Sequence, residues 1–591
     1  MIKQIIENLV KGSVVKLKLP EHSFSVEHPG DLSHGDFSTN VAMVLGKSAK
    51  INPRELAKKI LTELNATKPA VIEKIEIAGP GFINFFLTND FFLKSVSDVV
   101  KIEKSGKIYG SNENFKGKKV LVEYTDPNPF KVFHIGHLMS NAIGESISRI
   151  IENSGAKVER ANYQGDVGLH VAKAMWGILN LIKEKPADGA GITEQVEFIG
   201  RAYVLGAGKY EDDEKAKTEI TDLNKKIFEK TDAKLNALYD WGRRVSLEHF
   251  EEIYAKLGTK FNHYFFESEI AESGVKIVEE FLEKGVFEKS DGAVVFKGEN
   301  HGVHTRVFLN SQGLPTYEAK ELGLNKKKYD LIKPDLSVIV TANEQSDYFK
   351  VLLKAISLIY PKIAEITKHV SHGMLRFASG KMGSRKGNVI TGESLLNDVE
   401  EMVREKIAGR ELSSEEKKKI AEQVSVGAIK YSILKQSSGS DIIYDFEKSI
   451  SFEGDSGPYL QYSFVRAKSI LAKAKVEGVV GAEKNGEDGG KGGAGGKGGE
   501  GEGISGEISV LEKILYRFPE VVDRAGREFE PHLISTYLVE LAGAFNSYYA
   551  KNQIVNKDDP GSSYRVLLTE AFSTVLKNGL NLLGIPLPAK M

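Results

Sequence analysis

The residues best suited to chemistry are two histidines, His134 and His137, which flank Gly136. They follow a β-rich segment at residues 119–124 and begin a helical pattern over about 136–153. The first turn of a helix offers unpaired N–H groups and the positive end of the dipole, which favours phosphate. Side chains three apart share one face, and the glycine leaves space for a planar base. Two imidazoles can then donate hydrogen bonds to charge that develops at a phosphate.

Two histidines at this spacing, without further signals around them, would be interpreted as ordinary surface residues at a helix cap. The strand before them, the helix after them and the glycine between them favour function instead.

A second candidate is the basic loop at residues 381–388, which places Lys381, Arg385 and Lys386 within six positions. A glycine-bearing loop of this kind can close on polyphosphate while charge develops during a reaction. Basic loops are more often solvated surface, so the argument depends on the pairing with the histidine motif.

The elements that must position these residues are predicted to form an α/β domain over 111–395. The strand at 119–124, the helix after it and a second strand at 157–163 make a βαβ unit, which predicts a parallel, doubly wound sheet. Another apolar strand follows at 336–340. The stretch at about 172–290 is mostly helical and is predicted to be an insertion between two halves of the sheet.

Residues 1–110 are predicted to form a small α+β domain. Helical patterns cover 2–10 and 53–65, and short β patterns at 75–77 and 82–87 flank a Gly-Pro-Gly turn that is typical of a hairpin.

Helical patterns dominate residues 396–591, so we expect a separate all-α domain there. A Gly/Lys/Glu-rich stretch at about 478–507 interrupts it and has little apolar content to pack. We expect this stretch to be a disordered surface loop that joins two helices.

Composition sets limits on the class of protein. The 591 residues exceed what one core supports, so roughly two to four domains are expected. Hydrophobic residues make up 41% and charged residues 27%, as in globular proteins. No apolar run approaches the roughly 20 residues of a membrane span, and the N-terminal helical pattern mixes charges with apolar residues. We therefore expect a cytoplasmic protein without membrane association.

The sequence has no cysteine, which excludes disulfides, thiolate nucleophiles and thiolate-bound zinc. It has 13 histidines, but no HExxH-type spacing, and we predict no protein metal site. The formal net charge of −1 leaves a nucleic-acid partner open, because a local basic face is enough to bind one.

The His-Ile-Gly-His sequence at 134–137 resembles the HIGH motif of class I aminoacyl-tRNA synthetases, and residues 381–385 resemble their KMSKS loop. Within that class the chain is most similar to arginyl-tRNA synthetases. This resemblance spans nearly the whole chain and is carried by residues 122–129, 162–168, 314–317, 384–388 and 459–462.

The resemblance implies a Rossmann-type parallel-sheet catalytic domain, an N-terminal α+β domain and a C-terminal helical anticodon-binding bundle. It also implies the ligation of L-arginine to its cognate tRNA through an arginyl-adenylate, with ATP and Mg²⁺ as cofactors. Activation is then expected to require bound tRNA, and the enzyme is expected to be a monomer.

By match to the family, polar side chains line the arginine pocket: Glu123, Asn128, His134, Tyr317, Glu321 and Gln345. A guanidinium favours carboxylates in a planar, two-pronged pairing, so acids suit this pocket. Glu321 occupies a position where the family usually has aspartate. The glutamate side chain is longer, so the sequence does not define which atom of the substrate it contacts. Tyr317 and Glu321 lie four apart, so they share a helix face.

The resemblance also assigns the nucleotide site. ATP contacts are expected from His134, Gly136, His137, Ser384 and Lys386. The catalytic residues are expected to be His134, His137, Lys131, Lys381, Arg385 and Lys386. Ser384 replaces the lysine usual at the fourth position of KMSKS, as in many arginine enzymes, in which a lysine shortly before HIGH is thought to compensate. Lys131 occupies that place, and we predict that it contacts the ATP phosphates.

Two regions are expected to contact tRNA. Residues 30–40 resemble the appended domain of arginyl enzymes, which touches the outer corner of the tRNA, although they also suit ordinary turns and caps. In the helical domain, aromatics, amides and a cation suit unstacked bases: Tyr459, Gln461, Tyr462, Arg466, Asn546 and Tyr549. For these six residues, plain helix packing is an equally good interpretation.

Three alternatives remain open from the sequence. Another class I synthetase is disfavoured because the chain lacks cysteines for cysteinyl zinc chemistry and an acidic pocket would repel glutamate. A smaller HxGH nucleotidyltransferase would not need the long helical region or the N-terminal domain. A non-catalytic tRNA-binding paralogue conflicts with the intact histidine and basic-loop motifs.

Overall fold

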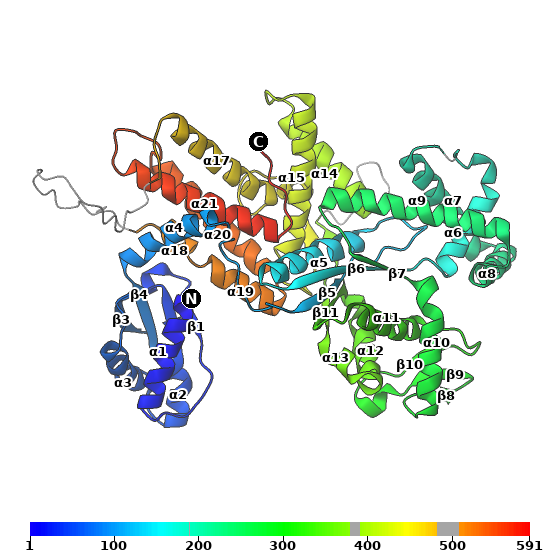
Figure 1. Cartoon of the computed structure of the whole chain (residues 1–591), viewed down its shortest axis with the longest axis horizontal. Helices are drawn as coiled ribbons and strands as arrows, with labels where there is room; N and C mark the ends of the chain where they lie inside the picture. Colours follow the sequence, from blue (N-terminus) through cyan, green and yellow to red (C-terminus); the bar gives the residue numbers. More distant parts are fainter. Residues whose placement is uncertain (188, 379–389, 482–507) are drawn as a thin grey trace, which may run out of the picture. The chain divides into compact units, whose positions relative to one another are not determined.

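A computed structural model describes residues 1–187, 189–378, 390–481 and 508–591 (Figure 1). The chain clusters into two compact units. The first contains Met1–Ser111, Arg466–Val522 and Tyr537–Asn578, and the second contains Asn112–Val465, Asp523–Thr536 and Gly579–Met591. The predicted basic loop and most of the glycine-rich stretch lie outside the described residues.

A five-stranded parallel sheet forms the centre of the second unit, with the order β12-β11-β5-β6-β7. Its strands are β5 (Lys119–Glu123), β6 (Lys157–Gln164), β7 (His263–Phe266), β11 (Leu336–Ala342) and β12 (Thr367–His372). The chain runs outward from β5 to β7 and then returns to the other side of β5. The direction of winding therefore reverses between β5 and β11, the place where such sheets bind ligands. The predicted Rossmann-type sheet is confirmed.

Helices cover both faces of this sheet, and its strands β5 and β11 are largely apolar, as burial on both faces requires, whereas β6 carries several polar residues. Helix α5 (Ile135–Asn153) contacts β5, β6 and β11. Helices α10 (Glu267–Glu283) and α11 (Tyr317–Ile332) share a buried cluster with the strands, through Leu121, Ala161, Phe265, Ile270, Leu324 and Ile332.

A helical layer follows β6 and consists of α6 (Leu169–Asn180), α7 (Ile192–Asp212), α8 (Glu214–Glu229) and α9 (Ala233–Leu257). Helices α6 and α7 cross so closely that a Cβ on Gly177 would lie 1.9 Å from the carbonyl oxygen of Ala202. The structure ends this layer at Leu257, earlier than the predicted insertion at 172–290, because β7 returns to the sheet. Strand β7 has only four residues, which are too few to show an alternating pattern in the sequence.

A small antiparallel sheet follows α10, with the order β10-β9-β8. It contains β8 (Glu288–Ser290), β9 (Ala293–Phe296) and β10 (Arg306–Leu309), and α11, α12 (Ser346–Ile359) and α13 (Pro361–Ile366) complete this region.

The separate helical domain predicted from residue 396 differs from the structure. Helices α14 (Gly392–Ile407) and α15 (Ser414–Leu434) contact α5, and the second unit continues to Val465. It also contains β13 (Leu375–Phe377), which pairs in parallel with β14 (Ile442–Tyr444), and α16 (Phe446–Ser449). A helical pattern shows that one face is buried but not against which neighbour it packs.

The first unit contains a four-stranded antiparallel sheet with the order β1-β2-β4-β3. Its elements are α1 (Ile2–Lys16), β1 (Val26–Glu27), β2 (Phe37–Thr39), α2 (Val41–Ala49), α3 (Pro53–Ala66), β3 (Ile72–Ala78), β4 (Phe82–Leu87) and α4 (Asn89–Lys104). The predicted hairpin is confirmed, because β3 pairs with β4 across Gly79 and Gly81, which both have positive φ.

Helical segments from the C-terminal part of the chain complete this unit, and Tyr516 packs into the core of the N-terminal sheet. The C-terminal helices are α17 (Gly457–Val476), α18 (Val510–Leu515), α19 (Phe518–Glu528), α20 (His532–Lys551) and α21 (Ser562–Leu582). The predicted fold class, a parallel-sheet domain with an α+β domain and a helical bundle, is confirmed.

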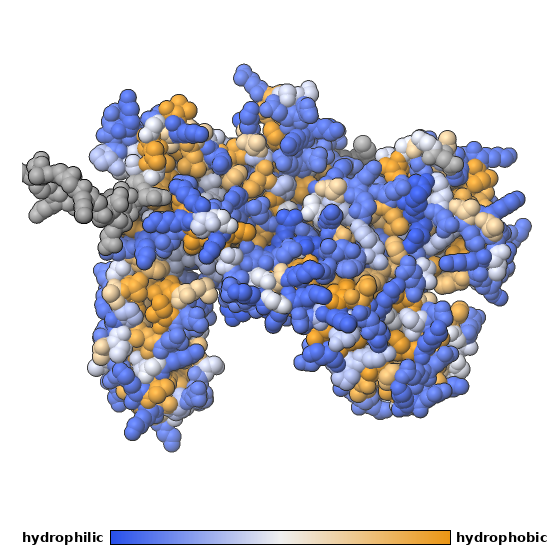
Figure 2. Space-filling view, in the orientation of Figure 1, coloured by the Kyte–Doolittle hydropathy of each residue, from blue (hydrophilic) through white to orange (hydrophobic). Residues whose placement is uncertain are grey.

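No helix among the described residues combines the length and apolar character that a membrane crossing requires. Figure 2 shows hydrophilic side chains over most of the visible face, with hydrophobic side chains scattered among them.

Candidate active site

The two motif histidines form a reciprocal cap at the start of α5. His134 is the N-cap residue, and its Nδ1 accepts the N–H of His137 at 3.4 Å. The Nδ1 of His137 accepts the N–H of His134 at 3.2 Å, and the two ring centroids lie 3.4 Å apart. A ring nitrogen that accepts a hydrogen bond carries no proton. Each neutral imidazole is therefore protonated at Nε2, which remains a hydrogen-bond donor.

These imidazoles are neutral donors at neutral pH. Burial lowers the pKa of His137 well below its ordinary value, and His134 and Lys131 lower it further. Burial and Lys131 also lower the pKa of His134. Lys131 itself is half-buried, and burial and the nearby Lys173 lower its pKa. The start of α5 thus gathers donors and cations, which suits an anion such as a triphosphate.

The loop between β5 and α5 is strained. Three non-glycine residues have left-handed backbones: Thr125 (φ 81), Asp126 (φ 49) and Phe130 (φ 66). The hydroxyl of Ser140 accepts the N–H of Thr125 at 3.0 Å, and that of Ser246 accepts the N–H of Phe130 at 3.0 Å. Such conformations cost about 1–3 kcal/mol each and concentrate at functional sites.

Glu123 and Glu321 lie in one buried electrostatic cluster at the carboxyl edge of the sheet. Both carboxylate oxygens of Glu123 lie 3.1 Å from the ammonium of Lys328, and both side chains are 2% exposed. Burial raises the pKa of Glu321 to about 8, Lys328 opposes this shift, and Glu123 and Glu267 add to it. The structure therefore brings these two predicted residues together.

Two further acids belong to this cluster and were missed from the sequence. Burial raises the pKa of Asp126 well above its ordinary value, and Glu123 adds to this shift. Burial also raises the pKa of Glu267, although its carboxylate lies 2.8 Å from the ammonium of Lys320. Asp126 follows β5 and Glu267 follows β7, so their position after strands of the same sheet was the available signal. Four acids thus face two lysines, which suits a further cation.

Polar atoms without partners surround the same acids. Among the described residues, the hydroxyls of Tyr163 and Tyr348 are buried and have no hydrogen bond. Burial raises the pKa of both tyrosines well above the ordinary value, and Glu321 adds to both shifts. Buried polar groups are normally paired, so these atoms indicate a polar ligand.

The other predicted arginine-binding residues lie at the same edge in different settings. Tyr317 begins α11 and is 64% exposed, and the ammonium of Lys320 lies 5.1 Å from its ring centroid. The Oδ1 of Asn128 accepts the N–H of Gly165 at 3.1 Å, so Asn128 shapes the loop after β6. Gln345 is exposed in the short helix η4 (Asn343–Gln345), which follows β11.

Four predicted nucleotide-site residues lie outside the described residues: Lys381, Ser384, Arg385 and Lys386. The chain just after them meets the histidine motif. The N–H of Gly392 donates to the carbonyl oxygen of Phe133 at 2.9 Å, and a Cβ on Gly392 would lie 2.9 Å from the carbonyl oxygen of His134.

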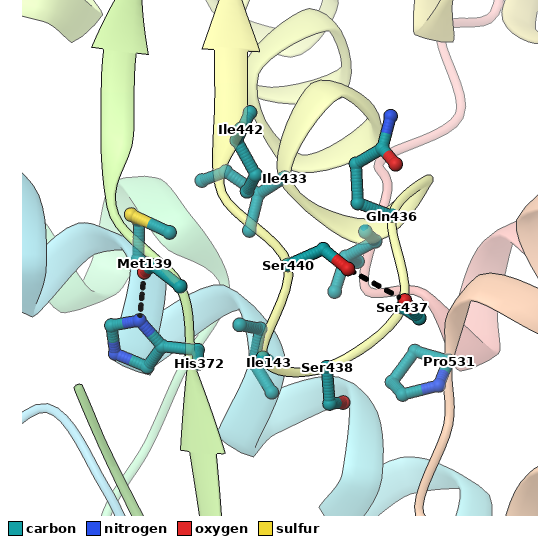
Figure 3. A pocket seen from close by; sticks show the side chains of 13 residues that line it. Met139, Ile143, His372, Ile433, Gln436, Ser437, Ser438, Ser440, Ile442 and Pro531 are labelled. Carbon is teal, nitrogen blue, oxygen red and sulfur yellow. Dashed lines mark hydrogen bonds between the residues drawn. The ribbon is translucent and has the colours of Figure 1, made fainter. Parts of the chain in front are cut away.

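A small cavity on another side of α5 is not a substrate site (Figure 3). Met139 and Ile143 of α5, His372 and the loop 436–440 line it. Its volume of about 10 Å³ holds at most one water molecule. The side-chain amide of Asn343 donates to the carbonyl oxygen of Gly439 at 2.8 Å, which ties this loop to η4.

The structure contradicts the prediction that Gln461 binds tRNA. Its side chain is fully buried, and its Nε2 donates to the carbonyl oxygens of Gln423 at 3.0 Å and Pro586 at 2.7 Å. The sequence could not show these distant partners. Tyr459 and Tyr462 belong to the same unit and are half-buried.

The other predicted tRNA residues gather in the first unit. Arg466 donates to the Oδ1 of Asn546 at 2.6 Å, and its guanidinium lies 5.4 Å from the ring centroid of Tyr549. Tyr549 is 41% exposed and borders an open groove of about 470 Å³. Cations and amides also line this groove: Lys473, Lys551, Asn552 and Gln553.

The N-terminal stretch at 30–40 is partly structural. The buried carboxylate of Asp36 accepts the N–H of Leu87 at 2.8 Å, and the side chain of Asn40 accepts the N–H of Ser25 at 2.9 Å. The exposed residues of this stretch lie at 30–34, where Leu32 alone is half-buried.

Three family models match the chain. Residues 98–446 match the model described as "tRNA synthetases class I (R), catalytic domain". Residues 460–591 match the "DALR anticodon binding domain", and residues 1–87 match the "Arginyl tRNA synthetase N terminal domain".

Curated relatives and solved structures cover the whole chain or nearly all of it. An arginine–tRNA ligase of Clostridium perfringens is 31% identical over 601 residues and covers 100% of both chains. One of Fusobacterium nucleatum is 34% identical over 569 residues, covering 94% of this chain and 93% of the relative. The fold matches the Thermus thermophilus arginyl-tRNA synthetase, with a TM-score of 0.80, 22% identity and 100% coverage of both chains. The Plasmodium falciparum arginyl-tRNA synthetase matches with a TM-score of 0.77 and 19% identity, covering 100% of this chain and 99% of that one.

Proposed function

Since the chain belongs to the arginyl-tRNA synthetase family and ligates arginine to tRNA, we propose that its buried acid cluster binds the substrate guanidinium. The observation that carries this assignment is the joint burial of Glu123 and Glu321 beside partnerless polar atoms at the carboxyl edge of the sheet. A guanidinium offers five donors in a planar fork, which suits carboxylates and tyrosine hydroxyls.

Within this cluster Glu321 is the main partner of the guanidinium. Lys328 already pairs with both oxygens of Glu123, whereas within the part of the chain that the structure describes the one donor to the carboxylate of Glu321 is the amide of Asn325, at 3.2 Å. A guanidinium beside Glu321 would stabilise its ionised form and replace the proton that burial favours there. Asp126 and Tyr163 complete the charge and hydrogen bonding, and Tyr317 and Gln345 line the entrance with Asn128.

The nucleotide binds at the start of α5. The Nε2–H groups of His134 and His137 and the ammonium of Lys131 face the triphosphate, and the backbone at Gly136 leaves space for adenine. An arginine carboxylate oxygen attacks the α-phosphorus, and the bond to the β-phosphate oxygen breaks, which gives arginyl-adenylate and pyrophosphate. The Nε2–H donors stabilise the charge on the α-phosphate oxygens during attack. Lys381, Ser384, Arg385 and Lys386 assist from the basic loop.

Transfer follows as the second step. The 2′-hydroxyl of the terminal adenosine attacks the arginyl carbonyl carbon, and AMP leaves with the electron pair of the mixed anhydride bond while its phosphate takes up the hydroxyl proton. Among the described residues no three acidic, histidine or cysteine side chains are grouped to hold a metal ion. We therefore assign Mg²⁺ to ATP itself, where phosphate oxygens and water are its preferred ligands.

The tRNA contacts are assigned to two groups. In the first unit, Tyr549 borders the groove whose aromatic, amide and cationic lining suits unstacked bases. Arg466 lies against Tyr549 and donates to Asn546, so these two residues support the same surface. In the second unit, Tyr459 and Tyr462 supply further aromatic surface. We place the enzyme in the cytoplasm as a monomer.

Charging of unfractionated tRNA with each of the twenty amino acids tests this function. Arginine alone should be attached, and its attachment should require ATP. Attachment of another amino acid in preference to arginine would overturn the assignment of the acid cluster.

A further inference from the structure

Asp166 is a fully buried carboxylate that the reaction above does not use. It follows β6, and its oxygens accept hydrogen bonds from two elements that are distant in the sequence, α9 and α10. A buried charge is costly unless it is paired and hydrogen-bonded, so packing alone does not require one here. The donors show which elements this carboxylate holds.

Asp166 caps helix α10. Its Oδ1 accepts the backbone N–H of Ser268 at 2.9 Å, and its Oδ2 accepts the hydroxyl of Ser268 at 2.7 Å. The N-cap residue of α10 is Phe266, whose side chain makes no capping hydrogen bond. A carboxylate at this place also meets the positive end of the helix dipole. Asp166 therefore fixes the first turn of α10 from outside that helix.

The first residue of α10 is Glu267, a member of the buried acid cluster. Its carboxylate pairs with the ammonium of Lys320 at 2.8 Å. Its Oε1 also lies close to the loop after β6, because a Cβ on Gly165 would lie 3.4 Å from it. A shift of the first turn of α10 would therefore move this acid within the cluster.

Asp166 also binds one face of α9. The hydroxyl of Tyr239 donates to the carbonyl oxygen of Asp166 at 3.0 Å and lies 3.2 Å from its Oδ2. The Nε of Arg243 donates to Oδ2 at 3.0 Å, and its guanidinium lies 4.0 Å from the ring centroid of Phe266. Tyr239 and Arg243 lie four apart, so they project from the same face of α9.

The same face of α9 holds the strained loop before the histidine motif. The ring of Tyr239 stacks on Phe130 at a centroid distance of 5.8 Å, and the hydroxyl of Ser246 accepts the N–H of Phe130 at 3.0 Å. A Cβ on Gly242 would lie 2.3 Å from the ring of Phe130, so the helix and this ring are in direct contact. Phe130 has φ 66 and directly precedes Lys131. A shift of α9 would therefore move Lys131.

Resting on the function proposed above, we propose that Asp166 is a positioning residue for both substrates. Through Ser268 it sets the position of Glu267 in the arginine pocket. Through Tyr239 and Arg243 it sets the position of Lys131 at the triphosphate. One buried carboxylate thereby fixes the two substrate sites relative to each other, as attack of one substrate on the other requires.

The test is aminoacylation by the full-length enzyme at saturating tRNA, with separate KM values for arginine and ATP. Ser268→Ala removes one hydrogen bond on the α10 side, so the KM for arginine should rise roughly two- to tenfold while that for ATP stays unchanged. Tyr239→Phe keeps the ring on Phe130 and removes the hydroxyl on the α9 side. The KM for ATP should then rise roughly two- to tenfold while that for arginine stays unchanged.

Asp166→Asn removes the charge and disturbs both sides. Each KM value should rise at least about fivefold. In this background Ser268→Ala should change the KM for arginine less than about twofold further, because residues of one network are not additive. Effects that multiply fully in the double variant contradict the proposal.

The matched control is Ser273→Ala, the same change on α10 at a hydroxyl that donates to the carbonyl oxygen of Ile270 at 2.7 Å within that helix. It should leave both KM values unchanged. A purely structural role for Asp166 predicts a lower melting temperature and a smaller active fraction, with unchanged KM values in every variant. That result would overturn the proposal.

If Asp166→Asn does not fold, Ser268→Ala and Tyr239→Phe provide the test, since each loses only a hydroxyl. Equal changes of both KM values in the two variants contradict the separate roles. A wild-type enzyme that charges arginine, with both variants identical to it, overturns the positioning role and leaves the charging function intact. A wild-type enzyme that does not charge arginine refutes the function instead.

Discussion

Both carboxylate oxygens of Glu123 lie 3.1 Å from the ammonium of Lys328, and both side chains are buried. The acid at the end of β5 is therefore already paired with a cation within the protein. The substrate guanidinium therefore needs a second carboxylate next to this pair, and we assign that role to Glu321. This relationship explains how an acidic pocket can stay folded while it is empty.

The pKa of Glu321 predicts how arginine affinity depends on pH. Burial raises this pKa to about 8, and a bound guanidinium favours the ionised form. The dissociation constant for arginine should therefore fall as pH rises from about 6.5 to 8.5. Titration calorimetry in buffers of different ionisation enthalpy should detect proton release on binding. Glu321→Gln should lose most of this pH dependence, and an unchanged slope in that variant would assign the titration to another group.

The same shift predicts the pH dependence of stability. In the unfolded chain a glutamate loses its proton near its ordinary pKa of 4.5, whereas Glu321 keeps it up to about 8. The folded state then binds more protons, so the free energy of unfolding falls as pH rises from about 4.5 to 8. Glu321→Gln should show a smaller decline over this range, measured by urea unfolding without substrate. An equal decline in both proteins contradicts the prediction.

The tautomer assigned to His137 predicts the effects of its replacements. His137→Ala removes an Nε2–H donor and should cost about 2–4 kcal/mol of transition-state stabilisation, roughly 30- to 1000-fold in kcat of ATP–pyrophosphate exchange. The KM for arginine should change little. His137→Gln keeps an amide donor near the position of Nε2 and should retain more activity than His137→Ala. Equal activities of the two variants would remove the donor role.

The close packing of α5 on Tyr124 predicts a stability effect. A Cβ on Gly144 would lie 2.3 Å from the ring of Tyr124, so Gly144→Ala should destabilise the second unit by about 1–3 kcal/mol. The matched control is Gly200→Ala in α7, where an added Cβ meets nothing within 4 Å. That change should stabilise by up to about 1 kcal/mol through helix propensity. Hydrogen exchange of α5 and α7 measures both effects locally, and faster exchange in the control alone would contradict the packing argument.

The groove beside Tyr549 predicts a defect specific to tRNA. Stacking of a base on this ring is worth about 1–3 kcal/mol, so Tyr549→Ala should raise the KM for tRNA roughly 5- to 150-fold. The KM values for ATP and arginine should stay unchanged at saturating tRNA. Tyr549→Phe keeps the ring and should behave nearly as the wild type. If both variants bind tRNA normally, the tRNA lies elsewhere.

Local patterns predicted much of this fold. The strand at 119–124, the helix after it and the Gly-Pro-Gly hairpin depend on neighbours in the sequence, and the structure confirms all three. The paired histidines at a helix start were predictable for the same reason. Their mutual capping was not, because it depends on side-chain rotamers.

Partners distant in the sequence explain what could not be predicted. Gln461 is an amide on a helix, and only the fold brings the carbonyls of Gln423 and Pro586 to it. The ion pair of Glu123 with Lys328 and the addition of β7 to the sheet also depend on long-range contacts. The buried Lys430 is a further case, because only the fold brings the carbonyl oxygens of Leu257 and Gly584 to its ammonium.

Discrimination between arginine and citrulline tests the central claim most directly. Citrulline has the shape of arginine with a neutral urea in place of the guanidinium. The measurement is the ratio of their dissociation constants in the wild type, in Glu321→Gln and in the control Glu269→Gln, whose carboxylate makes an exposed ion pair with Lys327. A charge-assisted hydrogen bond is worth about 1.5–3 kcal/mol, so Glu321→Gln should lower the preference for arginine roughly 10- to 150-fold, while the control keeps it. A preference for arginine that survives unchanged in Glu321→Gln would contradict the acid-cluster account.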